Sequence, residues 1–538
     1  MKLLSLLICA AITSFVIAQN PSFKNVEVFG SGFDDEGYEI KIVENRNYLV
    51  CGSFTDTLSV FDNTLISKGN NDAFFAKFDS LGNVLWINSI GGTTGDLATS
   101  IDMDSEGNYY FLGTFHSPVL YAFDTTVLSC GCAEYSFILK LSPLGELIWI
   151  KGLMGDGAFI AKDLKINEND EVIIGGSYYN SAFMYFGTYY SNGINDIILA
   201  AFSKNGEELF VKTYGNSGME SINSLEIDEN NNIFITGWFN TNIDFGNGQM
   251  NSVGLKDIFT AKLDEIGNII WSNSSGSAQN DEPNTINIDY NGNIIISGYY
   301  SGVIEFGSTM LESQGFEDVF IVKYNNLGDF VWIKTYGNSF DEAGISSGLD
   351  SDGNIYLTGR YMMDFIFGDT IVGGNTYSNA FVLKLDENGN ENWIKTINGN
   401  RNDAGIGLFV LENNKLLVTG YIRDSAYFDN ELFFATGQND IFVAELSLDI
   451  LQDVDNRFVA DIQIFPIPAS DYLHIVSNIA IAEFKIFDST GKLFKVLNTI
   501  NNSSYTLNIN DLNAGIYFLS IITVDGKLIK SKKIVINK

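Results

Sequence analysis

The chain has 538 residues, of which 45% are apolar and 13% aromatic, with 52 glycines and 6 prolines. This composition is typical of a globular, β-rich protein and not of a disordered one. The formal net charge of −35 repels the phosphates of nucleic acids and anionic lipids, so a nucleic-acid partner is disfavoured.

The N-terminus has the features of a secretory signal peptide. One lysine is followed by an apolar run, Leu3–Ala18, which is too short to span a bilayer with margin. Val16 to Ala18 fits a signal-peptidase site, so we expect residues 1–18 to be removed. Cys9 is not expected to be a lipoprotein cysteine, because Ile8 precedes it where a small residue is usual. No other stretch is long and apolar enough for a transmembrane segment.

Two kinds of residue recur along the chain at a period of about 61 residues. The marker glycines are Gly52, Gly113, Gly176, Gly237, Gly298, Gly359 and Gly420, spaced by 61 with one step of 63. An aromatic residue recurs at Trp86, Trp149, Phe210, Trp271, Trp332 and Trp393. Such periodicity is typical of stacked or radially arranged structural units.

Each repeat is predicted to contain four antiparallel strands. In one copy they are Ser347–Asp350, Ile355–Tyr361, Asn379–Asp386 and Asn392–Ile397. Tight Asp-x-x-Gly-Asn turns join the first strand to the second and the third to the fourth. The long polar connection between the second and third strands contains a possible extra strand at Ile366–Gly368. We expect this connection and the link to the next repeat to share one face, which we name the long-loop face and which is suited to recognition.

The fourth strand is missing after the last repeat, and the N-terminal segment can supply it. Val26–Gly30 lies one period before Ile87–Gly91, because Gly30 and Gly91 are 61 residues apart. A ring closed in this way has no unpaired sheet edges between its first and last units. The sequence therefore predicts an all-β fold, with a seven-bladed β-propeller over residues 20–449.

The repeated grammar of strand, Asp-x-x-Gly-Asn turn, strand and glycine, seen in Asp257–Gly276 and Ile286–Tyr300, resembles the bacterial SBBP β-propeller repeat family. It resembles NHL-type propellers more loosely. The resemblance implies the fold but says little about function, because propellers have unrelated activities.

A second module is predicted after a linker at 450–458. From Asp461 onward eight lysines face six acidic residues, a net charge of +2, which leaves −37 for the rest of the chain. Seven short alternating segments in residues 459–538 predict a small Ig-like β-sandwich.

Four motifs of this module, Pro466–Tyr472, Phe487–Lys492, Leu512–Phe518 and Lys532–Lys538, resemble the type A sorting domain of the type IX secretion system of Bacteroidetes. The residues that carry the resemblance are Pro466, Pro468, Gly491, Gly515, Tyr517, Lys532 and Lys533. Ile467 departs from the usual Asn between the two prolines. The resemblance implies Sec export, folding in the periplasm, passage through the secretion machinery, and surface attachment or release.

The link from each fourth strand to the next first strand carries an acidic residue in every copy. These residues are Asp35, Asp96, Asp156, Glu220, Asp281, Glu342 and Asp403. In a closed ring they could form a circle of carboxylates that binds calcium or a basic ligand. Alternatively, each carboxylate accepts backbone N–H bonds locally. The sequence leaves both interpretations open.

The residue after each marker glycine varies from copy to copy. Four consecutive copies place Trp238, Tyr299, Arg360 and Tyr421 there. Aromatic faces with a guanidinium could stack on a sugar or a peptide. The same side chains could instead merely cover the end of the sheet.

Catalytic motifs are not found. The chain has two histidines, His116 and His474, and no nucleophile elbow, zinc-protease helix or phosphate-binding loop. The three cysteines left after cleavage, Cys51, Cys130 and Cys132, cannot all pair internally. Cys130 and Cys132 could form a strained disulfide, bind a soft metal or be plain loop thiols.

We therefore expect a secreted or cell-surface binding or adhesion protein whose ligand is a glycan, a peptide or another surface protein. One alternative is a structural surface protein without a discrete ligand. The other is an extracellular polysaccharide hydrolase or lyase, because the 66 acidic residues leave room for a catalytic carboxylate pair.

Overall fold

The computed structural model describes residues 21–538 except 123–124, 130–133, 412–414, 448–461, 466–468, 489–491 and 524–527. The predicted signal peptide, Cys130, Cys132, Pro466, Pro468 and Gly491 lie outside the described residues. The chain divides into two compact units, Met1–Asp449 and Ile450–Lys538.

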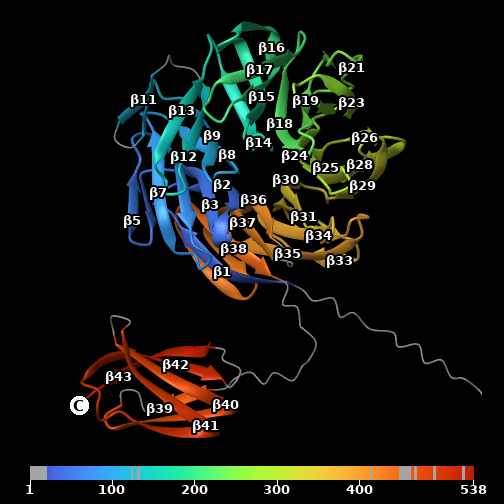
Figure 1. The fold of residues 1–538 in the computed structure, drawn as a ribbon. Helices are drawn as coiled ribbons and strands as arrows, with labels where there is room; N and C mark the ends of the chain where they lie inside the picture. Colours follow the sequence, from blue (N-terminus) through green and yellow to red (C-terminus); the bar gives the residue numbers. More distant parts are fainter. Residues whose placement is uncertain are drawn as a thin grey trace, which may run out of the picture. The chain divides into compact units, whose positions relative to one another are not determined.

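The first unit is built from sets of four antiparallel strands, which we number repeats 1 to 7 in chain order (Figure 1). Repeat 1 contains β2 (Glu36–Ile42), β3 (Tyr48–Phe54), β6 (Asp72–Phe78) and β7 (Val84–Gly91), with a 3-10 turn, η1 (Glu44–Arg46), after β2. Repeat 2 contains β8 (Asp96–Met103), β9 (Tyr109–Phe115), β12 (Tyr135–Leu141) and β13 (Leu147–Leu153). Repeat 3 contains β14 (Phe159–Ile166), β15 (Val172–Met184), β16 (Gly187–Phe202) and β17 (Glu208–Tyr214).

The later repeats follow the same order. Repeat 4 contains β18 (Glu220–Ile227), β19 (Ile233–Phe239), β22 (Asp257–Leu263) and β23 (Ile269–Ser275). Repeat 5 contains β24 (Glu282–Ile288), β25 (Ile294–Tyr300), β28 (Asp318–Tyr324) and β29 (Phe330–Tyr336). Repeat 6 contains β30 (Ala343–Leu349), β31 (Ile355–Tyr361), β34 (Asn379–Leu385) and β35 (Glu391–Gly399). Repeat 7 contains β36 (Ala404–Leu411), β37 (Lys415–Phe428), β38 (Glu431–Ser447) and β1 (Ser22–Phe29).

The N-terminal strand completes the last repeat, as predicted. β1 pairs antiparallel with β38, with Phe29 opposite Ile441 and Val28 opposite Phe442. The first strands of the repeats contact one another in order, and β36 contacts β2 (Figure 1). Gly30 and Gly91 also have equivalent surroundings. A Cβ on Gly30 would lie within 2.6 Å of the carboxylate of Asp440, and a Cβ on Gly91 would lie within 2.6 Å of that of Asp72. The ring of first strands is therefore closed.

The marker glycines are required by a β-bulge in each first strand. In repeat 5 the bulge lies between Pro283 and Thr285, and Gly298 pairs with Pro283. A Cβ on Gly298 would lie 2.1 Å from the carbonyl oxygen of Glu282. The corresponding distances at the other marker glycines lie between 1.9 and 2.3 Å. No side chain fits there, and the bulge turns the residues that follow it toward the centre of the ring.

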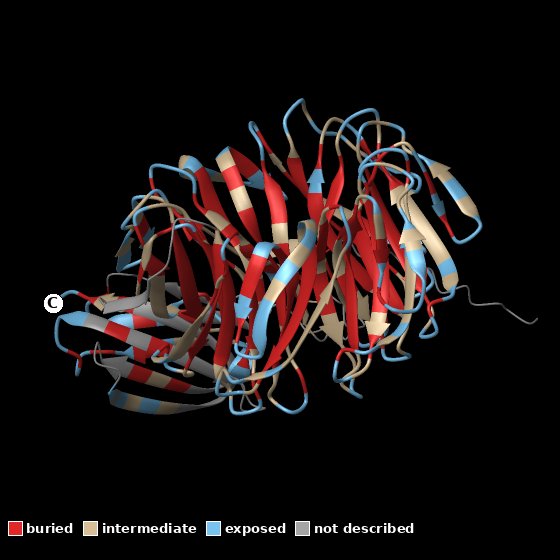
Figure 2. Ribbon diagram, turned by 90° about the horizontal axis from the view of Figure 1, so that it is seen from above, coloured by how far each residue is buried: buried red, intermediate tan, exposed pale blue. Residues whose placement is uncertain are grey.

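Turns and tryptophans fix each repeat to the next. In repeat 6, Asp350 accepts N–H bonds from Asp352 and Asn354 at 3.0 and 2.9 Å, and Gly353 has a φ of +78°. Trp332 of repeat 5 lies against Gly389, in a tight turn of repeat 6. Buried residues accordingly follow the strands, while the turns are exposed (Figure 2).

The long connections are hairpins and not open polar loops, which corrects the predicted nature of the long-loop face. The added strands are β4 (Thr57–Val60) with β5 (Asn63–Ile66), β10 (Val119–Ala122) with β11 (Thr125–Ser129), β20 (Asn242–Asp244) with β21 (Gln249–Asn251), β26 (Val303–Phe306) with β27 (Thr309–Glu312), and β32 (Phe365–Phe367) with β33 (Thr370–Val372). In repeats 3 and 7 the hairpin is formed by extensions of the main strands, β15 with β16 and β37 with β38.

Alternating apolar residues explain these hairpins. Phe365 and Phe367 are buried, and the Phe367 ring lies 5.1 Å from that of Tyr336 on the previous repeat. One face of the hairpin is therefore anchored to the body of the repeats. The extra strand expected at Ile366–Gly368 is confirmed as β32.

The second unit is a five-stranded sheet of β39 (Ile462–Phe465), β40 (Tyr472–Asp488), β41 (Leu493–Asn508), β42 (Gly515–Thr523) and β43 (Leu528–Ile536). The prediction of seven short strands was wrong, because β40 and β41 each continue through register shifts and join two predicted segments. Leu473, Ile475, Phe484, Leu519 and Ile534 belong to its core. The Ig-like sandwich stays a prediction. Within the described residues, no helix has the length and apolar character needed to cross a membrane.

Candidate functional site in the central channel

The first strands of repeats 1 to 7 enclose a cavity of about 350 Å³, which we name the central channel. Its wall is formed by the bulged residue of each first strand and the residues that follow it, from Tyr38 in repeat 1 to Ile406 in repeat 7. The bulges that required the marker glycines therefore also build this site.

The residues that follow the bulges are Glu39, Ser100, Asp163, Ser224, Thr285, Ser346 and Gly407. In repeats 1 to 4 and in repeat 6, the side chain of this residue accepts a backbone N–H of the next repeat. Ile101 donates its N–H to Glu39 at 2.6 Å, Leu225 to Asp163 at 2.9 Å, and Leu408 to Ser346 at 3.2 Å. The wall of the channel is thus held by side chains that accept backbone N–H groups across the repeats.

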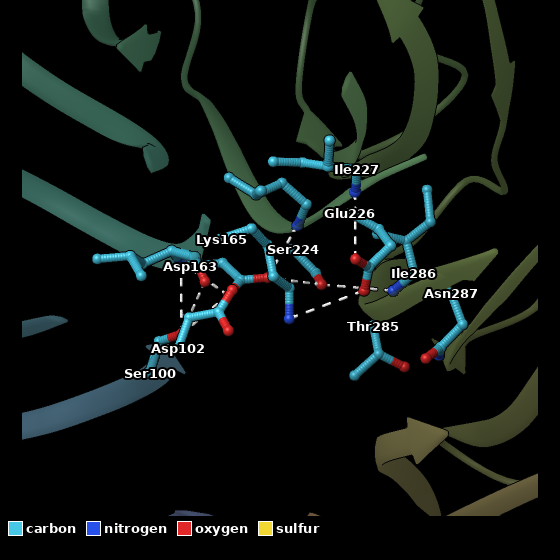
Figure 3. A network of polar contacts seen from close by, with 12 residues as sticks. Ser100, Asp102, Asp163, Lys165, Ser224, Glu226, Ile227, Thr285, Ile286 and Asn287 are labelled. Carbon is cyan, nitrogen blue, oxygen red and sulfur yellow. Dashed lines mark hydrogen bonds and ion pairs between the residues drawn. The ribbon is translucent and has the colours of Figure 1, made fainter. Parts of the chain in front are cut away.

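Two residues further along, the first strands of repeats 1 to 4 carry Lys41, Asp102, Lys165 and Glu226 in alternating charge, of which Asp102 is buried behind Lys41 and the other three line the cavity. The Lys41 ammonium lies 2.6 Å from the Asp102 carboxylate, and the Lys165 ammonium lies 3.8 Å from that of Glu226. Figure 3 shows Lys165 of β14 reaching across to Glu226, with Asp163 on the same strand as Lys165 and Ser100 on β8. Asp163 accepts hydrogen bonds from Ser100 and Ser224, both at 3.0 Å.

We name Glu39, Asp102, Asp163 and Glu226 the channel acids. Burial raises the pKa of Glu39 to about 7, and the nearby Lys165 limits the rise. Burial also raises the pKa of Glu226, against the pull of Lys165. Burial alone would lower the pKa of Lys165, but Asp163 and Glu226 outweigh it and raise that pKa well above its ordinary value. The four channel acids thus lie close to three lysines, Lys41, Lys162 and Lys165.

The rest of the wall has a different chemistry. Repeat 5 contributes Asn284, Thr285 and Asn287, which are uncharged hydrogen-bonding side chains. Repeats 6 and 7 add the apolar residues Ile345, Ile406, Leu408, Phe409 and Val410. The channel can therefore hold a small molecule that is polar along one side and apolar along the other.

The sequence interpretation missed the channel residues because it treated the first strands as short and apolar. The alignment of the repeats could have shown these residues. The position two residues after the one that follows each bulge is occupied by Lys41, Asp102, Lys165, Glu226, Asn287, Gly348 and Phe409. Charged residues at one register position of a buried strand, in some copies only, mark a position that packing does not dictate.

The structure places the four predicted aromatic and arginine residues on successive second strands. Trp238 is buried at 8% exposure, and the Lys256 ammonium lies 4.1 Å from its ring centre. Lys256 also pairs with Glu282 at 2.5 Å, and Glu282 bonds to the Tyr299 hydroxyl. Trp238 is therefore covered and offers no stacking face, so a stacking platform of all four residues is not formed.

Arg360 and Tyr421 are more accessible. The Arg360 side chain is 44% exposed, and its guanidinium lies 3.7 Å from Glu317. Burial raises the pKa of Tyr421, and the charge of Arg360 opposes the rise. The same charge opposes the raised pKa of Tyr299, where burial is again the main cause. Arg360 therefore lies within electrostatic reach of both tyrosines.

Six of the seven predicted acids are fully buried, and we name them the loop acids: Asp35, Asp96, Glu220, Asp281, Glu342 and Asp403. Asp281 accepts the N–H of Ser277 at 2.6 Å and that of Ser301 at 3.0 Å. Asp96 accepts the N–H of Gly92 and of His116 at 2.7 and 3.2 Å. The seventh acid, Asp156, is exposed.

This geometry supports the local-bonding interpretation of the loop acids. Among the described residues, no group of three His, Cys, Asp or Glu side chains is placed to hold a metal ion. The loop acids therefore do not fit a shared calcium site. Asp35, Asp96, Asp281 and Glu342 each tie two connections of their own repeat together.

Glu220 and Asp403 lack the full set of partners of the other loop acids. Neither oxygen of Glu220 and one oxygen of Asp403 has a hydrogen-bond partner among the described residues. Burial raises the pKa of each to about 8, and the charge of Asp196 adds to the rise for Glu220. Both groups are therefore largely protonated at neutral pH.

Comparison with known proteins identifies the second unit. The family described as secretion system C-terminal sorting domain matches residues 463–537. The uncharacterized WD repeat-containing protein L264 of Acanthamoeba polyphaga mimivirus is 23% identical in an alignment of 486 positions that covers 72% of this chain and 35% of that protein. The chain thus spans about a third of the length of this relative.

Two solved structures are similar over most of the chain at low scores. One is PorZ, a surface component of the type-IX secretion system of Porphyromonas gingivalis (10% identity, 93% of this chain and 81% of that one, TM-score 0.31). The other is the extracellular domain of the putative hybrid two component system BT3049 of B. thetaiotaomicron (9% identity, 93% and 68%, TM-score 0.28).

The sorting-domain match covers Gly515, Tyr517, Lys532 and Lys533, which the sequence analysis had singled out. Gly515 begins β42, and Tyr517 is buried in the core of the unit. The second unit is a C-terminal sorting domain of the type IX secretion system, and the protein is one that is exported to the cell surface or secreted.

Proposed function

We propose that this protein is a non-catalytic binding protein of the cell surface or the extracellular space. Its first unit is a seven-bladed β-propeller of SBBP-type repeats, and its central channel holds a small ligand. Export proceeds through Sec and the periplasm. The observation that carries the proposal is the central channel, with its charged arc and its apolar arc on one rigid wall.

The charged arc supports binding over a purely structural role. Charged groups in a poorly hydrated space cost stability unless they are well paired. Lys165 and Glu226 lie 3.8 Å apart, which is a loose pair. A channel that served only packing could be filled with apolar side chains, as the bodies of the repeats are.

The ligand class follows from the wall. The four channel acids outnumber the three lysines Lys41, Lys162 and Lys165, which favours a ligand that donates hydrogen bonds or carries a cationic group. Phe409 and Leu408 favour an apolar surface on another side of the same molecule. A hydroxylated or amine-bearing small molecule meets both conditions.

The test is a thermal-shift screen of the mature chain against sugars, amino acids and amines, followed by calorimetry of the hits. A true ligand at about 100 times its Kd should add about 2.7 kcal/mol of stability. The double variant Lys165→Met/Glu226→Gln should lose this binding. Lys256→Met, which lies outside the channel wall, should keep it. Binding that survives the double variant would exclude the channel as the site.

A hydrolase is the second candidate, and one observation favours it. Glu39 has a pKa of about 7 because it is buried, and the charge of Asp163 contributes to the rise. A protonated carboxyl beside a second carboxylate is the arrangement that glycosidases use. Release of reducing sugar from a polysaccharide, abolished by Glu39→Gln, would establish this function in place of the first.

Export can be tested separately. Deleting Asp461–Lys538 should leave the first unit folded but trap it in the periplasm, because the sorting domain would be missing. Protease shaving of whole cells measures the fraction that reaches the surface. Normal surface display of the truncated protein would refute the role of the second unit in export.

A further inference from the structure

The hairpin tip of repeat 3 exposes an unusual number of large aromatic side chains. We name Tyr179–Ile194, at the ends of β15 and β16, the aromatic hairpin. Tyr185 is 86% exposed and Tyr190 68%, while Tyr179, Phe183, Phe186 and Ile194 are each about half exposed. Clustered exposed apolar surface of this kind marks an interaction site.

The aromatic hairpin is a well-ordered structure and not a loose loop. The ladder of β15 and β16 continues to its tip, where Met184 pairs with Gly187. Ala182 and Met184 on one face are buried in the main core. The N–H groups of Tyr185 and Phe186 both donate to the Glu208 carboxylate, at 2.5 and 3.2 Å. The exposed rings therefore project from a backbone that is fixed at its base and at its tip.

The lack of charged residues in the aromatic hairpin indicates what kind of partner it binds. No residue from Val172 to Asn195 is charged, although the chain carries −35. The tip of the corresponding hairpin in repeat 7 includes Arg423, Asp424, Asp429 and Glu431. A patch without cations offers nothing to an anionic polymer or an anionic membrane, which the rest of the chain repels. It suits an uncharged partner.

We propose that the aromatic hairpin is a docking surface for a neutral polysaccharide. The C–H faces of pyranose rings stack on tyrosine and phenylalanine, and the tyrosine hydroxyls can hydrogen-bond to sugar hydroxyls. Rigid aromatic side chains lose little conformational entropy on binding. This surface is on the strands of one repeat and is separate from the central channel. The proposal therefore does not depend on whether the channel binds a ligand.

The test is affinity electrophoresis and pull-down of the mature full-length chain with neutral polysaccharides (cellulose, xylan, mannan and starch) and with the anionic polymers alginate and polygalacturonate. Tyr185→Ser/Phe186→Ser/Tyr190→Ser should weaken binding to one neutral polymer by about tenfold or more, as expected for loss of aromatic anchors. The matched control is Tyr427→Ser/Phe434→Ser in the hairpin of repeat 7, which should change binding less than about twofold.

Because the altered side chains are exposed, the melting temperature should stay unchanged in both variants, and this excludes misfolding as the cause. The proposal is overturned if no neutral polysaccharide binds, if both variants bind equally well, or if anionic polymers bind better. It is also overturned if light scattering shows dimers that the hairpin variant abolishes, since the partner would then be a second copy of the chain.

Discussion

The loop acids and the channel acids are two sets of carboxylates in the same unit with opposite patterns. The loop acids occur in nearly every repeat with similar partners, in that most accept N–H groups from two connections of their own repeat. The channel acids occur only in repeats 1 to 4 and differ from one repeat to the next. Residues that recur therefore serve the fold, and residues that break the recurrence are the candidates for function.

The marker glycines and the channel position, which is the position of Lys41 in repeat 1 and of Phe409 in repeat 7, show the same contrast between recurring and varying residues. The glycine is invariant because a carbonyl oxygen of the first strand occupies the place of its side chain. The channel position ranges from Lys41 to Phe409 because it faces open space and is free of that constraint. Four predictions test how far this contrast holds.

The largest effect is expected at a marker glycine. In Gly298→Ala the new Cβ would lie 2.1 Å from the carbonyl oxygen of Glu282, so the bulge must move. We expect a loss of about 3 kcal/mol in the free energy of unfolding, measured by chemical denaturation. Gly32→Ala is the matched control, because nothing lies within 4 Å of its Cβ. Similar stability of the two variants would mean that the bulge is not what fixes the glycine.

A loop acid should come next. Asp281→Ala leaves the N–H groups of Ser277 and Ser301 without their acceptor. We expect a loss of about 2 kcal/mol in the free energy of unfolding. Asp156→Ala, the exposed member of the same series, should change it by less than about 0.5 kcal/mol. An equal loss in both would contradict a role for the loop acids in the fold.

The channel pair should matter least for stability. Lys165→Met/Glu226→Gln removes both partners of a loose pair, and Asp163, which loses its nearby cation, keeps its hydrogen bonds from Ser100 and Ser224. We expect the free energy of unfolding to change by no more than about 1 kcal/mol, in either direction. The single variant Lys165→Met should be worse, because Glu226 and Asp163 would lose their cation. A double variant less stable than Asp281→Ala would remove the distinction between the two sets.

The sequence predicted those features that depend on recurrence. The period located each marker glycine, and the spacing of Gly30 and Gly91 predicted the pairing of β1 with β38. The motifs around Gly515 and Tyr517 predicted the sorting domain. In each case one residue type is required by local backbone geometry or by a linear motif, so a single sequence shows it.

Features that depend on cross-repeat geometry were not predicted. Nothing local shows that Lys165 meets Glu226, because the contact exists only once the ring is closed. Trp238 looked available for stacking, but Lys256, which directly precedes β22, covers its ring. The two strands predicted in place of β40 were separated by a register shift that only the partner strands define. In all three cases the sequence did not show which residues or strands would be neighbours in the folded chain.

The fourth prediction is a dependence of stability on pH, set by Glu220 and Asp403. Burial raises the pKa of each to about 8 in the folded chain, while unfolded carboxyls titrate near 4. The folded protein therefore holds protons that the unfolded chain releases, and stability falls as pH rises from about 5 to about 8. Loop acids with smaller raised pKa values, such as Asp35 and Asp281 at about 6, act in the same direction.

We expect the melting temperature to be about 3 °C or more higher at pH 5 than at pH 8. Glu220→Gln/Asp403→Asn should flatten this dependence, because the amides do not titrate. Glu39→Gln, in a channel acid whose raised pKa is about 7, should flatten it less, since a single group is removed. Calorimetry across this pH range measures the effect. A melting temperature that rises toward pH 8 would show that these carboxyls are ionised in the folded chain. Glu220 and Asp403 would then need hydrogen-bond donors other than those seen in the structure.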